Sequence, residues 1–302
     1  MRRIRWLLAL AAVLGGLYWW GAVDNRMPAD AGFALDLAQV RQRATALPGD
    51  RPHAIRYEKV AEFSFFENMV DAGAGFGRMP MAIFAYQLEF DERTVLIDSA
   101  MTRDIAPPGF MMPFFDDAAQ ERVRQALRQA ALIVVTHEHA DHIGGIVRHP
   151  ELEALLPALR LTREQLAEPW RMQPAELPAA LAGHAGLEYD GMHALAPGVV
   201  LIEAPGHTPG TQLVYVQLAD GNEVLFLGDV AWHALNVEQQ RQRPRWVTAL
   251  LIREDRDAVF GQLKTLHELA QRQPRLQLVP GHDGAAVQRL ADQGWLQPGF
   301  KL

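Results

Sequence analysis

Apolar residues are distributed differently in two parts of the chain. Residues 6–23 form a continuous apolar run, whereas short apolar runs bounded by turn residues begin at about residue 56. In this second part, short runs predict strands and stretches with a period near 3.6 predict helices. The predicted strands span 81–90, 94–97, 131–136, 199–203, 211–217, 223–227 and 276–279, and the predicted helices span 117–130, 143–156, 162–166 and 257–271. Strands that alternate with helices and form hairpins indicate an α/β sandwich of mixed sheets.

The N-terminal run has the features of a membrane anchor. Three arginines precede it, and its 18 uncharged residues are close to the shortest length that crosses a bilayer. The positive flank stays in the cytoplasm, so the rest of the chain is expected on the exported, periplasmic side of the inner membrane. Cleavage after Ala22 would place Trp20 at the −3 position, which favours an uncleaved anchor over a signal peptide of a secreted protein. Both interpretations stay open for residues 1–23.

The remainder is predicted to contain a linker and one domain. Residues 24–55 carry DNRMPADAG and ALPGDRP around a short helical stretch at 33–46, which is typical of a linker. Residues 56–302 then form the folded domain. The whole chain has 29 Lys and Arg against 36 Asp and Glu. Residues 1–23 hold three arginines and no acidic residue, so the rest of the chain has 26 basic against 36 acidic residues. This charge disfavours nucleic acid as a partner.

The chain has no cysteine and 11 histidines. The lack of cysteine excludes disulfides, thiolate metal sites, iron–sulfur clusters and a cysteine nucleophile. Any metal must therefore be held by histidine and carboxylate side chains.

Four motifs at predicted strand ends contain such side chains. They are HEHADH at 137–142, PGHTPG around His207, LGD ending at Asp229, and PGHD around His282. The candidate metal ligands are His137, His139, Asp141, His142, His207, Asp229 and His282. Imidazole and carboxylate together suit zinc, manganese or iron. Seven ligands are too many for one tetrahedral ion and fit two ions that share a bridging carboxylate. A lone histidine at a strand end is usually only a hydrogen-bonded loop residue. The presence of the HEHADH motif, however, strengthens the assignment of the residues in the other three motifs as metal ligands.

In this order, the four motifs resemble those of the metallo-β-lactamase fold superfamily, over about residues 58–290. The resemblance implies an αββα sandwich of two mixed β-sheets flanked by helices, with two divalent metal ions, best matched by Zn²⁺, at one edge. It also implies how the ligands are shared: His137, His139 and His207 for the first ion, Asp141, His142 and His282 for the second, and Asp229 between them. Asp98 in LIDSA matches a structural aspartate of the family.

The same resemblance implies hydrolysis by a hydroxide that bridges the two metals. Asp141 and Asp229 are the expected catalytic residues, because they fix the geometry and accept the proton. Thr136 and Thr208 are expected to hydrogen-bond ligating groups, and Glu138 to lie behind the ligands or face solvent. The predicted function is a metal-dependent hydrolase of a lactone, an ester or a related small carbonyl substrate. The alternatives are a phosphodiester or phospholipid hydrolase, a mononuclear iron oxygenase and a non-catalytic binding protein.

Several residues narrow the choice within the superfamily. The absence of cysteine excludes the β-lactamases with a cysteine ligand, and Asp229 argues against the others. No basic residues follow His282, unlike in glutathione thioesterases. Acyl-homoserine lactonases share all seven ligands but have tyrosine where this chain has Trp232, whose N–H donates a hydrogen bond but is no acid. The neighbouring His233 could supply a titrating group, although a packed tryptophan and a solvent-facing histidine fit the pattern equally well.

Apolar segments are candidates for the substrate pocket. The family resemblance implies that residues 63–66 and 73–81 lie in a loop over the metals, and residues 107–115 are unusually apolar for a loop. We expect Phe66 and Phe76 to contact the substrate, with packing into the core as the alternative. The basic stretch 241–245 is either a contact for carboxylates or lipid head groups or a solvated loop.

Overall fold

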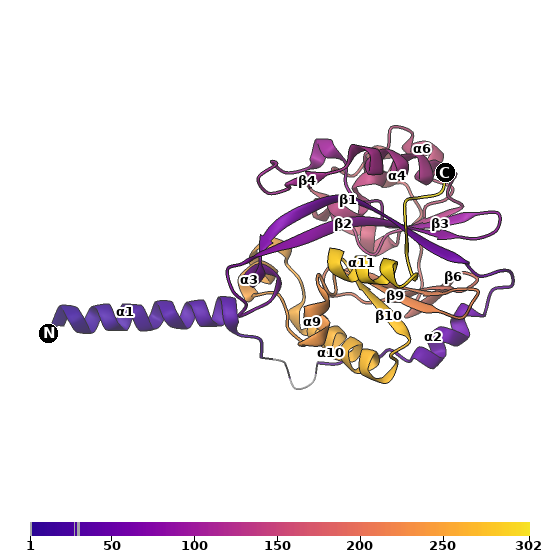
Figure 1. The fold of residues 1–302 in the computed structure, drawn as a ribbon. Helices are drawn as coiled ribbons and strands as arrows, with labels where there is room; N and C mark the ends of the chain where they lie inside the picture. Colours follow the sequence, from indigo (N-terminus) through magenta and orange to yellow (C-terminus); the bar gives the residue numbers. More distant parts are fainter. Residues whose placement is uncertain (1, 27, 29–30) are drawn as a thin grey trace.

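The body of the chain is built from four layers, with two β-sheets face to face and helices on both outer sides (Figure 1). The computed structural model describes residues 2–26, 28 and 31–302. Residue 1 of the predicted anchor and residues 27, 29 and 30 of the predicted linker lie outside the described residues. This architecture confirms the predicted αββα sandwich of mixed sheets.

The first sheet has the strand order β11–β1–β2–β3–β5, and β4 pairs with β1. Its strands are β1 (Ala54–Phe66), β2 (Arg78–Glu89), β3 (Thr94–Ile97), β4 (Phe114–Phe115), β5 (Leu132–Val134) and β11 (Gln297–Pro298). β1 and β2 form a long antiparallel pair in which Tyr57 lies opposite Tyr86, and β3 runs parallel to β5. The sheet is therefore mixed.

The second sheet has the order β10–β9–β8–β7–β6. Its strands are β6 (Met192–Ala196), β7 (Val199–Glu203), β8 (Gln212–Gln217), β9 (Glu223–Gly228) and β10 (Leu276–Pro280). Successive side chains of a strand point to opposite faces. Accordingly, Val199 and Leu201 of β7 pack between the sheets, whereas Val200 and Ile202 pack on the other face. Because both faces of this sheet are buried, the sequences of its strands are continuous apolar runs.

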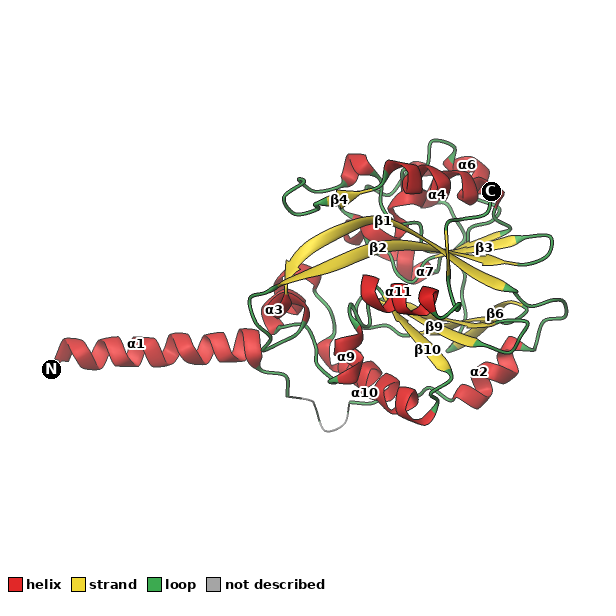
Figure 2. Cartoon of the chain, viewed as in Figure 1, coloured by secondary structure: helices red, strands yellow, loops and turns green. Residues whose placement is uncertain are grey.

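Most helices lie on the outer sides of the two sheets, whereas the helix Gly284–Asp292 packs into the core between the sheets through Val287 and Leu290 (Figure 2). Those described are α2 (Leu37–Ala44), α3 (Glu67–Val70), α4 (Asp117–Gln129), α5 (Ala140–Val147), α6 (Leu152–Leu155), α7 (Arg163–Ala167), α8 (Ala179–Ala182), α9 (Ala234–Glu238), α10 (Arg256–Arg272) and α11 (Gly284–Asp292), with the 3₁₀ turns η2 (Arg103–Ile105) and η3 (Pro169–Met172) and the π-helical turn η4 (Val247–Ile252). α4 and α6 lie outside the first sheet, and α2 and α10 lie outside the second (Figure 1).

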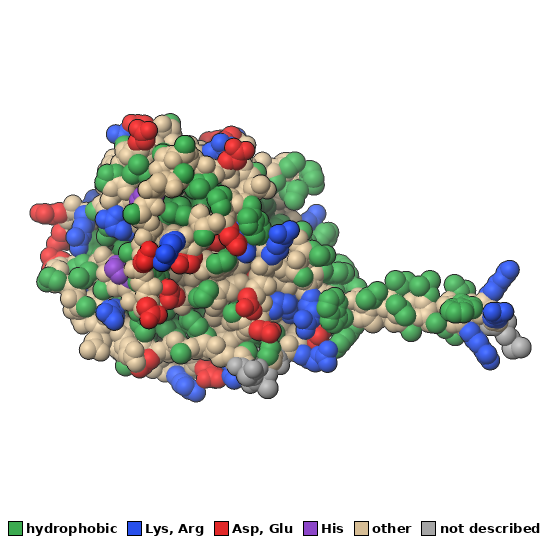
Figure 3. Space-filling view, turned by 180° about the vertical axis from the view of Figure 1, so that it is seen from behind, with side chains coloured by type: hydrophobic (Ala, Val, Ile, Leu, Met, Phe, Trp, Pro, Cys, Tyr) green, Lys and Arg blue, Asp and Glu red, His purple; other side chains and the backbone are tan. Residues whose placement is uncertain are grey.

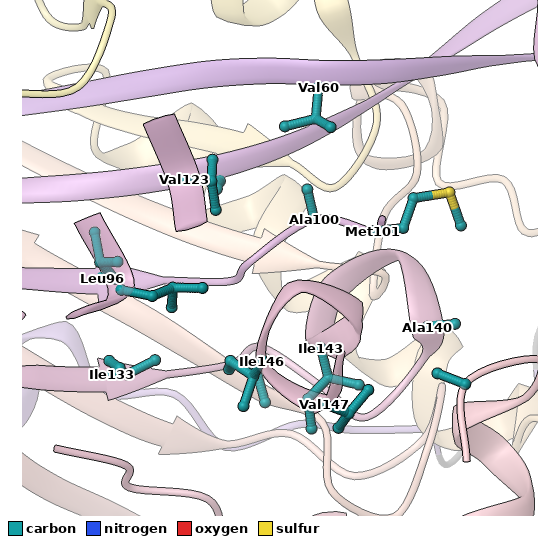
Figure 4. Close-up of a cluster of buried hydrophobic side chains, with 14 of the residues drawn as sticks. Val60, Leu96, Ala100, Met101, Val123, Ile133, Ala140, Ile143, Ile146 and Val147 are labelled. Carbon is teal, nitrogen blue, oxygen red and sulfur yellow. The ribbon is translucent and has the colours of Figure 1, made fainter. Parts of the chain in front are cut away.

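Helix α5 begins within the HEHADH motif and packs against the outer face of the first sheet. Ile143 and Ile146 of α5 pack with Leu96 of β3, Ile133 next to it on β5, and Val123 of α4 (Figure 4). Full burial of side chains of this size stabilises the fold by about 1.5–3 kcal/mol each. The helix that presents Asp141 and His142 is thereby fixed to the sheet.

The structure confirms most predicted elements and corrects two of them. The predicted helix 143–156 is wrong, because α5 ends at Val147 and α6 begins only at Leu152. Pro150 lies in the gap; it lacks an N–H and disfavours helical backbone at His149. The predicted loop is also wrong at 63–66, which are the end of β1, and at 78–81, which are the start of β2 and pair with them.

The N-terminal segment forms one long helix that projects from the body (Figure 1). α1 (Arg2–Tyr18) continues into the π-helical turn η1 (Trp19–Val23), and together they are long and apolar enough to cross a membrane. A signal sequence near the N-terminus would pass the same test. Within the predicted linker, α2 packs on the second sheet through Leu37, Val40 and Ala44. The division of the chain at residue 55 stays a prediction, but α2 itself is part of the packed body.

Candidate metal centre

The carboxyl ends of four strands deliver the candidate ligands to one edge of the sandwich. β5 runs into the segment 137–142, and β7 is followed by the loop that carries His207. Asp229 follows β9 directly, and His282 follows β10. Because these strand ends meet at one edge, residues far apart in the sequence become neighbours.

All seven predicted ligands are brought together, in two groups. The first group is His137, His139, His207 and Asp229, and the second is Asp141, His142 and His282. Within each group, one potential ligand atom per residue lies within 4.8 Å of the others. In the first group, His139 Nδ1 lies 3.1 Å from His137 Nε2 and 3.0 Å from His207 Nε2. The division between groups is the one that the family resemblance predicts.

Asp229 lies between the two groups. Its Oδ2 is 3.2 Å from His207 Nε2 and 3.6 Å from His137 Nε2. Its Oδ1 is 3.3 Å from His142 Nε2 and 3.1 Å from His282 Nε2. One carboxylate thus offers a separate oxygen to each group, which is the arrangement a bridging ligand requires.

Gly281 is required for this placement of Asp229. A Cβ atom at position 281 would collide with Asp229 Oδ1 and with the backbone of Gly228. The glycine of the PGHD motif therefore lets the loop after β10 approach the carboxylate.

The side chains present fit two divalent cations. His142 Nε2 and Asp229 Oδ1 are buried without a hydrogen-bond partner, and buried polar atoms are rarely left so. Burial lowers the pKa values of His137 and His139 well below the usual range, which keeps both imidazoles neutral, as metal ligation requires. Burial alone would raise the pKa of Asp229, but positive charge on the surrounding histidines, chiefly His282, outweighs it and holds the pKa well below the usual range. Nitrogen and oxygen donors of this kind suit zinc.

The second group is supported by the first sheet. His142 Nδ1 donates to Asp98 Oδ2 at 2.8 Å, and His282 Nδ1 donates to the carbonyl oxygen of Ala82 at 2.8 Å. Asp98 also accepts hydrogen bonds from the backbone N–H of Thr136 at 2.6 Å and from its hydroxyl. Asp98 has a φ of 59°, an unusual conformation for a residue other than glycine. These bonds fix the imidazoles so that Nε2 faces the site.

The first group is supported by a buried ion pair that the sequence did not reveal. His207 Nδ1 donates to Glu254 Oε2 at 3.1 Å, and Arg243 donates to the same oxygen at 2.5 Å. Burial raises the pKa of Glu254, but the nearby Arg243 outweighs this effect and leaves it below the usual value. Both residues lie outside the four motifs. The basic stretch 241–245 is the nearby sequence signal, and Arg243 within it is buried instead of solvated.

The residue after His137 lies behind the ligands. Glu138 is fully buried, and the Thr208 hydroxyl donates to its Oε2 at 2.8 Å. Burial raises the pKa of Glu138. Of the two expectations for Glu138, the solvent-facing one is therefore wrong.

Trp232 contacts the Asp229 carboxylate. Its Nε1–H donates to Asp229 Oδ2 at 2.6 Å, and the Arg243 guanidinium lies 4.7 Å from the centroid of its ring. The ring also faces the pocket beside Phe65, with ring centroids 6.0 Å apart. Trp232 therefore connects the pocket wall, Asp229 and the ion pair behind His207.

The candidate ligands form the floor of a pocket of about 600 Å³. His139, Asp141, His207, Asp229 and His282 reach into it. The walls are largely apolar and come mainly from three places: the β1–β2 ends, the segment 101–111 and η4. Their apolar members include Phe63, Phe65, Met69, Met81, Met101, Ile105, Ala106, Pro107, Met111, Trp232, Val247, Leu251 and Ile252.

The other predicted substrate contacts lie outside this pocket. Phe66 is 41% exposed under the Arg78 guanidinium, and Phe76 is 68% exposed. Since β1 alternates its side chains, Phe63 and Phe65 line the pocket while Phe66 points away. His233 accepts a hydrogen bond from Leu235 N and caps α9, and its Nε2 lies 3.2 Å from Asp283 Oδ2 in the PGHD motif.

Comparison with known proteins agrees with this arrangement. Residues 78–282 match the Metallo-beta-lactamase superfamily. The N-acyl homoserine lactonase AiiA of Bacillus thuringiensis subsp. kurstaki is 25% identical over 187 residues, which cover 53% of this chain and 68% of that protein. The hydroxyacylglutathione hydrolase of Xylella fastidiosa (strain M23) is 30% identical over 139 residues, which cover 46% of this chain and 41% of that protein.

A solved structure shares the fold. It is an N-acyl homoserine lactone hydrolase with the product N-hexanoyl-L-homoserine bound at its catalytic metal center, and it aligns with a TM-score of 0.62 at 18% identity. The alignment covers 79% of this chain and 96% of that chain. The family match spans more than half of the sequence and includes all seven candidate ligands. The chain therefore belongs to the metallo-β-lactamase superfamily.

Proposed function

We propose that this protein is a binuclear metallohydrolase that opens a lactone or a related carboxylic ester with an apolar acyl part. The observation that carries the proposal is the position of Asp229, which presents one oxygen to each ligand group at the floor of an apolar pocket. Its relatives include a lactonase and a thioester hydrolase by name, and both of these reactions attack a carboxylic carbonyl.

The two ligand groups would hold one divalent ion each, with zinc best matched by the donors. Ions bound there would supply a water of lowered pKa and an electrophile for the carbonyl oxygen of the substrate. His137, His139 and His207 would hold the first ion, and Asp141, His142 and His282 the second. Asp229 would contribute to both.

The chain's own residues orient the reactants. Trp232 donates to Asp229 Oδ2 and holds this carboxylate in the plane that serves both groups. Asp141 is the more exposed of the two candidate catalytic carboxylates, so it is the one accessible to a proton released at the pocket floor. Phe63, Phe65 and Met111 provide an apolar wall for an acyl chain.

A substrate panel tests the proposal. Zinc-loaded protein is assayed with lactones of increasing acyl length, an aryl ester and a bis-aryl phosphodiester, with His137→Ala as the inactive control. We expect turnover of lactones, with kcat/KM rising with acyl length because the pocket walls are apolar. Turnover of the phosphodiester alone would contradict the substrate class.

Metal analysis distinguishes the binuclear hydrolase from an iron oxygenase. We expect about two zinc ions per chain in protein purified with zinc present, and hydrolysis that persists without oxygen. One iron per chain and no hydrolysis would contradict the proposal.

We also propose that residues 2–23 remain attached and anchor the protein in a membrane, with the body on the exported side. The support is the packing of this helix's end against the body. Ala22 is only 1% exposed, Gly73 N donates to its carbonyl at 2.9 Å, and the Asp24 carboxylate pairs with Arg245 at 3.2 Å. Western blotting of membrane fractions for a chain of full length tests this proposal. A processed, soluble chain would contradict it.

A further inference from the structure

The base of the N-terminal helix and one wall of the pocket are made by the same segment. Tyr18 packs edge-on against Trp246 with ring centroids 6.0 Å apart, and Arg245 lies over the ring of Trp20. Trp246 directly precedes η4, whose Val247, Leu251 and Ile252 line the pocket. The helix therefore joins the body beside the pocket.

The outer side of η4 is apolar and exposed. Leu250 is 76% exposed and Leu251 is 67% exposed. Phe66 and Phe76 are exposed on the neighbouring β1–β2 connection, which contacts the base of the helix through Gly73 and Val23. Grouped apolar side chains of this size mark a surface that contacts a partner.

Positive charge borders this apolar group. Arg26 and Arg241 are well exposed, Arg78 lies over the ring of Phe66, and Arg245 is partly exposed beside Trp20. Asp24 pairs with both Arg26 and Arg245, which offsets part of this charge. Figure 3 shows hydrophobic and basic side chains together around the base of the helix. Arginine next to exposed apolar side chains fits a bilayer surface, where the guanidinium meets lipid phosphate and the apolar groups enter the acyl region.

We infer that the anchor-side face, defined as Trp246, Leu250, Leu251, Phe66 and Phe76, rests on the bilayer that holds the N-terminal helix, so that the pocket receives an amphiphilic ester or lactone from the lipid phase. The occupant is the bilayer surface, because this face is continuous with the apolar helix and is bordered by arginines at its base. Leu251 belongs to both the exposed face and the pocket wall, so it provides an apolar path between them. The inference rests on the proposed hydrolase and on the proposed anchor, and it adds the source of the substrate.

The absence of cysteine allows a direct test in the full-length protein. Leu250→Cys is labelled with an environment-sensitive fluorophore, and Glu92→Cys, on the exposed β2–β3 hairpin at the opposite end of the body, is the matched control. Both proteins are reconstituted in vesicles of phosphatidylethanolamine and phosphatidylglycerol, with and without brominated acyl chains. We expect strong quenching by brominated lipid at position 250 and none at position 92. Equal, weak quenching at both positions would overturn the inference.

A kinetic measurement tests the delivery of substrate. Leu250 is exposed and lies outside the pocket lining, so Leu250→Asp should fold and should leave kcat/KM for a short, water-soluble lactone unchanged. For a long-chain lactone presented in the same vesicles, we expect KM to rise about tenfold, since an aspartate cannot enter the acyl region. An unchanged KM for the long-chain substrate would overturn the inference.

The two measurements separate this inference from the proposed function. Quenching at position 250 in a protein without lactone or ester turnover would contradict the proposed function and support the membrane contact. Lactone turnover with a water-exposed label at position 250 would contradict only the membrane contact.

Discussion

The two groups of candidate ligands are supported in different ways. The second group is fixed by short bonds to the first sheet, through Asp98 at the end of β3 and the backbone carbonyl of Ala82 in β2. In the first group, His207 is fixed by Glu254, which follows η4 and pairs with Arg243, which lies before η4. His137 of this group has a different neighbour, the Thr136 hydroxyl, at 3.2 Å from its Nδ1. One support belongs to the rigid core, and the other belongs to the segment that forms the pocket wall.

This difference indicates that a given substitution should affect the two ligand groups differently. A substitution near η4 affects His207 through Glu254, and it affects the Asp229 carboxylate through Arg243 and Trp232. A substitution in the first sheet reaches His142 and His282. The following variants break one support at a time.

Loss of the shared carboxylate should have the largest effect. Asp229→Ala removes an oxygen from both groups, so we expect metal content to fall in both and activity to fall by about a thousandfold or more. Metal content by mass spectrometry and kcat/KM on the best substrate measure this. If Asp229→Ala retained two metals and full turnover, the bridging role would be wrong.

Loss of the support for the second group should come next. Asp98→Asn weakens the hydrogen bond to His142 Nδ1 and leaves the side chain at the same size. We expect the affinity for one of the two metals to fall about 10–100-fold while the other is retained. Chelator competition measures both affinities, and circular dichroism verifies folding. Equal weakening of both sites would contradict the separate supports.

Loss of the support for the first group has a second consequence. Glu254→Gln leaves Arg243 buried without its carboxylate, so we expect the free energy of unfolding to fall by about 3 kcal/mol and one metal to bind about tenfold more weakly. The double variant Glu254→Gln/Arg243→Met should recover most of the stability but not the metal affinity. Recovery of both would mean that Glu254 acts only as a counter-ion for Arg243.

Removal of the tryptophan N–H should have a smaller effect. Trp232→Phe keeps an aromatic ring beside Arg243 and deletes the donor to Asp229. We expect kcat to fall about tenfold, with both metals retained, because one charge-assisted hydrogen bond is lost. Steady-state kinetics together with metal content test this expectation. A raised KM with unchanged kcat would instead make Trp232 a substrate contact.

Substitution of Glu89, a carboxylate outside both ligand groups, should have the smallest effect. Burial alone would raise the pKa of Glu89, but Lys301 and Arg56 outweigh it and lower the pKa to about 2. A carboxyl group whose pKa is lower in the folded state than in the unfolded state stabilises the protein at pH values above its unfolded-state pKa. This stabilisation is lost as the pH falls toward 2. Glu89→Gln should therefore destabilise the protein at neutral pH. The difference in stability between this variant and the wild-type protein should become smaller at acidic pH. Thermal unfolding at several pH values measures this, and metal content should not change.

The candidate ligands are predictable from the sequence because each lies in a short motif at or shortly after the end of a strand. The four ligands between His137 and His142 also share one continuous segment, so their proximity needs no knowledge of the rest of the fold. Glu254 and Arg243 are not predictable, because the contact of Glu254 with His207 and its pairing with Arg243 depend on how the loops after β7 and β9 fold together.

The pocket wall shows where the sequence pattern is insufficient. If the apolar run 63–66 is interpreted as a loop, the sequence does not show which of its side chains face the metal site. Once these residues are known to continue β1, the alternation of a strand puts Phe63 and Phe65 on the pocket side and Phe66 on the other. The pairing with β2 that decides this is a long-range contact, which the local sequence does not contain.

The most direct test of the binuclear site is anomalous diffraction from a crystal of the zinc-loaded protein. We predict two anomalous peaks, one beside His137, His139 and His207 and one beside Asp141, His142 and His282, with Asp229 between them. A single peak at one group, with Asp229 turned away from it, would contradict a bridged binuclear site.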